Sequence, residues 1–171
     1  MKQKVLVFPL LCVLLFVIGV TVFGLSLFHQ DDLFTPPVAE LDARSGRPVV
    51  PEELGWSELY QEGMPYSLYI CGVCEPNEEN QIAVWFYNSA ENDVLLSMKV
   101  YDGDTCIGET GFLKPDEYVQ YVSVDQKLDE GTDIRYEIIG YEPDTYYSAG
   151  TVSLNTSVSY EIGRASCRER V

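Results

Sequence analysis

Two cysteines separated by two residues are the sharpest chemical signal in this sequence. Cys71 and Cys74 enclose the pair Gly72-Val73, and a CxxC at the start of a helix is the arrangement in which a lowered thiol pKa supports redox chemistry. Here the motif ends a strand-like run, and the next five residues include three glutamates, whose negative charges raise a thiol pKa. Thiol redox chemistry therefore remains only an alternative function.

Disulfide formation is the second interpretation of these cysteines. In an extended strand, Cys71 and Cys74 would lie about 10 Å apart and face opposite ways, too far for a mutual bridge. Cys106 lies on a later strand-like run and is then the natural partner for one of them. A zinc site would need a fourth ligand, and the only histidine, His29, lies beside the N-terminal apolar segment, so we predict no metal.

The remaining polar motifs indicate turns rather than chemistry. Asp102-Gly103-Asp104 begins like a calcium loop, but the regular acidic spacing and the final glutamate of an EF-hand are missing. A hairpin turn accounts for it. Serine–histidine catalysis lacks a suitably placed histidine, and the many carboxylates form no pattern that singles out a pair. The sequence therefore predicts no catalytic residue and no cofactor.

Aromatic side chains offer a binding chemistry instead. The chain has twelve tyrosines and two tryptophans, and exposed aromatic rings on a sheet can bind sugars or proteins, although they also stabilise strands by pairing across them. Strand alternation places Trp85 and Tyr87 on one face of the same run. We take Trp85, Tyr87 and Tyr101 as the candidate ligand-facing aromatics.

Short strand-like runs separated by turn signals must position these residues. In the run 81–87, Ile82, Val84 and Phe86 occupy one face, and Leu96, Met98 and Val100 form a second apolar face with Ser97 outside. No convincing helical stripe follows, and no crossover helix separates the runs. The pattern predicts a single all-β, antiparallel sandwich of about seven strands, at residues 67–74, 81–87, 96–100, 105–110, 118–124, 134–141 and 150–159.

Three short motifs resemble the immunoglobulin-like domains of small uncharacterised membrane-anchored proteins of Gram-positive bacteria. They are Phe86-Tyr87-Asn88 followed by Asn92, Leu113-Lys114-Pro115, and Leu128-Asp129-Glu130-Gly131 before a strand. Residues 128–132 are also similar to a strand-entry turn of fibronectin type III domains, although Ile134 stands where those domains usually carry tyrosine. The resemblance covers about residues 66–160 and implies a sandwich at the cell surface. That family has no established activity, so the resemblance implies no functional residue.

An apolar segment precedes this domain. Residues 5–28, from Val5 to Phe28, contain no charge, and a helix of that length reaches about 36 Å, enough to span a bilayer. The segment is longer than the core of a cleavable signal peptide, although cleavage after Gly24 or Ser26 stays open. Lys2 and Lys4 precede it, so we expect residues 1–4 in the cytoplasm and the rest outside, where disulfides are common.

Two further segments flank the predicted domain at residues 66–160. Residues 29–65 carry several prolines among acids without a sustained period, which predicts an extended stalk, although a short helix after Pro51 could fold Trp56 back onto the domain edge. Residues 161–171, with sequence EIGRASCRERV, resemble a translated sequencing adapter. We expect this tail to be non-native and leave it out of the fold.

Charge narrows the range of partners. Residues 29–160 hold 25 acidic against 6 basic side chains, and such a field repels nucleic acid and anionic lipid surfaces. We therefore expect a non-enzymatic, membrane-anchored, extracellular interaction or assembly module with an unknown protein or glycan partner. The alternatives are a carbohydrate-binding domain that uses exposed aromatics, and a thiol-redox protein that uses the CxxC.

Overall fold

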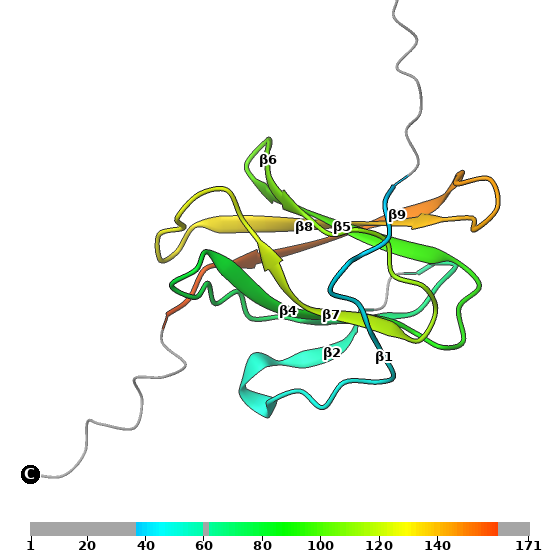
Figure 1. Cartoon of the computed structure of the whole chain (residues 1–171). Helices are drawn as coiled ribbons and strands as arrows, with labels where there is room; N and C mark the ends of the chain where they lie inside the picture. The colour runs from blue at the N-terminus through cyan, green and yellow to red at the C-terminus, as the bar shows by residue number, and fades with distance from the viewer. Residues whose placement is uncertain (1–36, 60–61, 161–171) are drawn as a thin grey trace, which may run out of the picture. The chain divides into compact units, whose positions relative to one another are not determined.

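The computed structural model describes residues 37–59 and 62–160, which form an all-β structure (Figure 1). Nine strands are present in these residues: β1 (Arg44–Ser45), β2 (Trp56–Leu59), β3 (Leu68–Cys71), β4 (Gln81–Asn88), β5 (Leu95–Asp102), β6 (Thr105–Glu109), β7 (Glu117–Ser123), β8 (Asp133–Tyr141) and β9 (Ser148–Ser157). They build a five-stranded sheet in the order β1-β7-β4-β3-β2 and a four-stranded sheet in the order β6-β5-β8-β9. Neighbouring strands within each sheet are antiparallel.

Two predicted segments lie outside the described residues. These are the apolar segment 5–28 and the tail 161–171. Among the residues that are described, no helix is long and apolar enough to cross a membrane.

Alternation along the strands explains the core. Ile82, Val84 and Phe86 on β4 are at most 1% exposed, as the sequence predicts, and so are Leu96 and Met98 on β5. Inward side chains of both sheets belong to one continuous apolar cluster, so the sheets bury their apolar faces against each other. The prediction of an all-β fold with two antiparallel sheets is confirmed. Ser97 differs from its prediction, because it lies on the outward side of β5 and is nevertheless buried.

The expected stalk is wrong for the described part of residues 29–65. β1 pairs with β7 at one edge of the five-stranded sheet, and β2 pairs with β3 at the other (Figure 1). Between them lies the short 3-10 helix Glu52–Leu54, as expected after Pro51. The described prolines of this segment all lie outside β1 and β2, so they remove no hydrogen bond from either ladder.

A buried amide network connects β4 to the loops beside it. Asn88 is fully buried, and its Nδ2 donates to the carbonyl oxygens of Val94 and Leu113 at 2.9 and 3.0 Å. Asn92 Nδ2 donates to Asn88 Oδ1 and to the Ser67 carbonyl oxygen. These side chains thus bond to backbone carbonyl oxygens of three loop segments and to each other, so the side-chain amides of Asn88 and Asn92 have partners.

Candidate binding face

A distorted residue in β4 shapes the outer side of the five-stranded sheet. The register between β4 and β7 shifts between Ala83 and Phe86, and Trp85 within this bulge has a φ of 43°. A left-handed backbone is an outlier for so bulky a residue, and bulges commonly re-aim side chains near functional sites. The Trp85 carbonyl oxygen accepts a hydrogen bond of 2.8 Å from Trp56 Nε1, which holds the bulge against β2.

Five aromatic side chains from four strands cover this side of the sheet. Trp56 on β2 stacks on Tyr69 of β3, with ring centroids 4.9 Å apart. The ring of Tyr87 on β4 lies 6.0 Å from that of Tyr69. Trp85 stacks on Tyr118 of β7 at 6.0 Å, with the rings only 15° from parallel. We call this set, Trp56, Tyr69, Trp85, Tyr87 and Tyr118, the aromatic face.

Arg47 lies on one end of the aromatic face. Its guanidinium carbon is 4.5 Å from the Tyr69 ring centroid and 5.3 Å from that of Trp56, both within the range of cation–π attraction. Two carboxylates hold neighbouring rings, since Tyr69 donates its hydroxyl to Glu58 at 3.3 Å and Tyr87 donates to Asp116 at 3.0 Å. We call Trp56, Tyr69 and Tyr87, together with the carboxylates of Glu58 and Asp116, the cation site.

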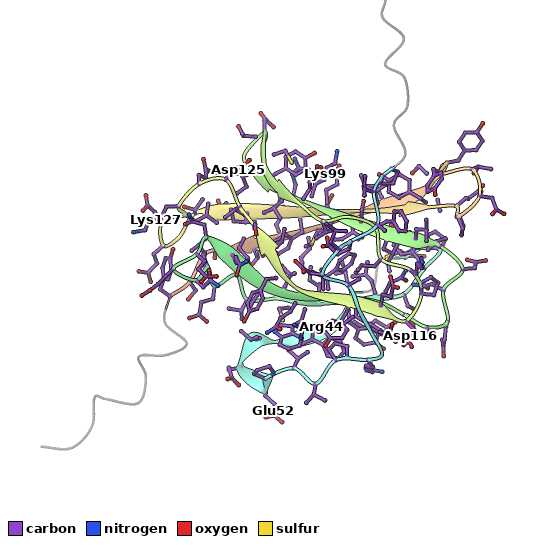
Figure 2. The ribbon with its side chains drawn as sticks, viewed as in Figure 1. Arg44, Glu52, Lys99, Asp116, Asp125 and Lys127 are labelled. Carbon is purple, nitrogen blue, oxygen red and sulfur yellow. The ribbon has the colours of Figure 1, made fainter. Side chains whose placement is uncertain are left out.

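Charged side chains mark the two sides of the domain in Figure 2. Arg44 and Asp116 lie on the side of the five-stranded sheet, whereas Lys99 lies on the opposite side, with the four-stranded sheet. Arg44 is on β1 and Lys99 on β5. The four strands that carry the aromatic face, β2, β3, β4 and β7, all belong to the sheet that also contains β1.

The three predicted ligand-facing aromatics do not come together. Trp85 and Tyr87 share the aromatic face, but Tyr87 is only 5% exposed, so its ring borders the site formed with Trp56 and Tyr69 and offers little open surface of its own. Tyr101 lies on β5 in the other sheet, beneath Arg135, whose guanidinium carbon is 4.2 Å from the ring centroid. Strand alternation could have identified Tyr69 and Tyr118 as outward residues. Tyr69 lies between the inward Leu68 and Ile70, and Tyr118 begins its predicted run just before the inward Val119.

Comparisons with known proteins add no assignment. No match was found among protein-family models, curated proteins or solved structures. Function is therefore inferred from the residues of this chain alone.

The cysteines do not form the expected bridge. Cys71, Cys74 and Cys106 are free in the structure, and Cys106 is exposed on β6 while the other two are buried. The chain bends at Gly72 after β3, and Cys74 then forms an isolated parallel bridge with Val158, the residue that follows β9. Cys74 joins the main apolar cluster and Cys71 does not. Cys71 ends β3 of the five-stranded sheet, whereas Cys106 lies on β6 of the four-stranded sheet.

Burial also sets the chemistry of these thiols. Burial raises the pKa of Cys71 to about 12 and raises that of Cys74 as well. Tyr136 is fully buried, and burial raises the pKa of its hydroxyl, with the nearby Cys74 acting in the same direction. A reactive thiolate needs a lowered pKa and access to solvent, and both buried cysteines lack these properties. Within the described residues, no three metal-ligating side chains converge.

Proposed function

We propose that this chain is a non-enzymatic binding module that segment 5–28 holds at the outer surface of a cell membrane. The observation that carries this proposal is the aromatic face, where Trp85 keeps a left-handed backbone and its half-exposed ring stacks on Tyr118. Such a conformation costs on the order of 1–3 kcal/mol and persists where surrounding structure holds it, often at functional sites. The half-exposed rings offer a rigid contact surface of the kind that partners recognise.

The strand order supports an immunoglobulin- or fibronectin-III-like sandwich as the scaffold. Strands β3-β4-β7 oppose β6-β5-β8-β9, which corresponds to a three-stranded and a four-stranded sheet in those domains. Ile134 stands where a corner tyrosine is usual, and Tyr160 donates its hydroxyl to the Leu128 carbonyl oxygen at 2.6 Å instead. We infer that Tyr160 takes over the role of that tyrosine in fastening the turn.

Site-specific cross-linking in the cells that express the protein tests the binding role. A photo-reactive amino acid in place of Tyr118 reports on the aromatic face, and the same substitution at Thr151, exposed on β9, is the matched control. We expect a discrete cross-linked product from position 118 and none from position 151. Equal products from both positions, or no product from either, would contradict the proposal.

Carbohydrate binding is the second candidate function. Its support is the near-parallel pair Trp85 and Tyr118, because flat, half-exposed rings can stack on sugar rings. A glycan array probed with the full-length protein in uncharged detergent tests it, together with Trp85→Ala. Selective glycan binding that Trp85→Ala removes would favour this candidate over a protein partner, and a blank array would exclude it.

A further inference from the structure

We propose that the cation site receives an arginine or lysine side chain from a basic segment of a partner protein, and that Arg47 fills this site while the partner is absent. The inference rests on the proposed binding role of the aromatic face and names the chemistry of its partner. Arg47 thus acts as a built-in competitor, and binding requires its side chain to leave.

The position of Arg47 defines what the site accepts. Its guanidinium carbon lies over Tyr69 and Trp56 at 4.5 and 5.3 Å, and the Tyr87 ring stands 6.5 Å from that of Trp56 at an angle of 50°. Aromatic rings grouped in this way bind ammonium and guanidinium ions through their electron-rich faces. In the structure, the guanidinium of Arg47 therefore already occupies the cation site.

Carboxylates strengthen the preference for a cation. Glu58 and Asp116 each accept a hydrogen bond from a ring hydroxyl of the site, so two negative charges lie at its border. Burial raises the pKa of the Tyr87 phenol, and Arg47 acts on that pKa in the opposite direction, which agrees with a positive charge close to this ring. An incoming cation meets the same environment.

Arg47 can leave without moving the backbone. Its side chain is exposed, whereas the following Pro48 is buried and the preceding Gly46 donates its N–H to the Asp116 carbonyl oxygen at 2.7 Å. The backbone is thus fixed on both sides of a side chain that solvent reaches. Within residues 37–59 and 62–160, the one ion pair joins Arg135 to Glu137, so no carboxylate in that region holds Arg47 in a salt bridge.

Charge complementarity favours a basic partner over a second copy of this chain. The sequence has a net charge of −16, so two copies repel each other, while a lysine- or arginine-rich segment is attracted and steered toward the surface. A nucleic acid or an acidic lipid surface is disfavoured by the same field.

Titration with a minimal ligand tests the site. The ¹⁵N-labelled full-length protein in uncharged detergent has two indole N–H signals, one for each tryptophan, and the ligands are N-acetyl-arginine amide and its neutral analogue N-acetyl-citrulline amide. We expect the arginine derivative to shift the Trp56 signal of Arg47→Ala saturably. The wild type should need more ligand, by about tenfold for a site that Arg47 fills about nine-tenths of the time.

Two variants serve as controls. Arg135→Ala removes the other arginine–aromatic contact, on β8, and should titrate like the wild type. Arg47→Gln keeps much of the aliphatic stem while removing the charge, so it should give the saturable Trp56 shift expected of Arg47→Ala even if truncation to alanine impairs folding.

Three results would overturn the proposal. They are equal shifts with the citrulline derivative, equal affinity in the wild type and Arg47→Ala, and no shift in a folded Arg47→Ala or Arg47→Gln protein. The two levels of inference fail separately in the cross-linking experiment. If position 118 still cross-links and N-acetyl-arginine amide does not compete, the cation site is wrong and the binding role stands; if position 118 gives no product, the binding role is wrong.

Discussion

The outer sides of the two sheets each place an arginine over an aromatic ring, but they build this contact differently. On the four-stranded sheet, Arg135 lies opposite Tyr101 across a neighbouring strand, 4.2 Å from its ring, and its Nη1 bonds to Glu137 at 2.9 Å. On the five-stranded sheet, Arg47 comes from the connection after β1 and covers rings of β2 and β3. An ion pair with Glu137 fixes Arg135 over its ring, whereas no ion pair within the described residues fixes Arg47.

The difference shows how the N-terminal segment changes one sheet and not the other. The four-stranded sheet consists of strands that the periodic pattern already predicts. On its outer side, Arg135 forms an ion pair with Glu137 two residues along the same strand. The five-stranded sheet gains β1, β2 and Arg47 from the segment before the predicted domain. Its outer side is therefore assembled from residues distant in sequence, and we expect it to be more sensitive to single substitutions.

The largest difference in the free energy of unfolding should appear between variants of two buried polar residues, one in each sheet. Asn88→Ala should lower the free energy of unfolding by about 3 kcal/mol, because it removes hydrogen bonds to two backbone carbonyl oxygens inside the protein. Ser97→Ala on β5 should change it by less than about 1 kcal/mol. Urea unfolding of the full-length protein in uncharged detergent measures both, and similar losses would contradict the contrast.

A smaller difference should separate Trp56 from Tyr101. Trp56→Ala removes the stack on Tyr69 and the N–H bond to the Trp85 carbonyl oxygen, and we expect a loss of about 2 kcal/mol. Tyr101→Ala removes a half-buried ring beneath one arginine and should cost about 1 kcal/mol. The unfolding midpoints of the two variants decide this, and a larger loss for Tyr101→Ala would reverse the proposed ranking of the two faces.

Alkaline pH should destabilise the domain, and Cys71 at the end of β3 should account for part of the loss. Burial raises the pKa of Cys71 from 9.0 to about 12, so the folded state keeps the thiol proton more tightly than the unfolded state. The stability from this group is complete below pH 9 and falls as the pH rises toward 12, by up to about 1.4 kcal/mol per pH unit. Unfolding measured from pH 8 to 11 should show a shallower decline in Cys71→Ala.

Cys106→Ala is the matched control for that experiment. Its thiol is exposed on β6 of the other sheet, so we expect the variant to decline with pH as steeply as the wild type. Equal slopes for the wild type, Cys71→Ala and Cys106→Ala would show that burial of Cys71 does not contribute to the alkaline loss.

The smallest effect concerns the two arginines themselves. Arg135→Ala loses both the ring contact and the ion pair with Glu137, and Arg47→Ala loses ring contacts alone. We expect both losses to lie below about 1 kcal/mol, with Arg135→Ala the larger. Raising the salt concentration should reduce the loss in Arg135→Ala more, because an exposed ion pair is screened. A loss above about 2 kcal/mol in the free energy of unfolding of Arg47→Ala would show that Arg47 mainly stabilises the fold.

The strands of the domain could be predicted from sequence because alternation survives in them. The apolar residues Ile82, Val84 and Phe86 are separated by outward residues, and β3 to β9 correspond to the seven predicted runs. β1 and β2 contain two and four residues, too few for a period to emerge. Their strand structure depends on partners elsewhere in the chain, so the prolines around them dominated the prediction.

The candidate site was only half predictable for the same reason. Alternation puts Trp85 and Tyr87 on one face, but no local signal shows that Tyr101 belongs to the other sheet, since that depends on the pairing of β5 with β8. Nor does a tryptophan signal a left-handed bulge, which usually favours glycine. The contact of Arg47 with Trp56 and Tyr69 arises only when the N-terminal segment folds back.

The left-handed backbone of Trp85 has a consequence for how this position tolerates mutation. Glycine or asparagine relieves the unfavourable φ of 43°, yet either one removes the ring that stacks on Tyr118. Selection for stability alone should therefore favour a small residue at position 85, whereas selection for binding should favour an aromatic one. In a library randomised at position 85, clones chosen for stability should drift toward small residues, and clones chosen for retained cross-linking should keep an aromatic one.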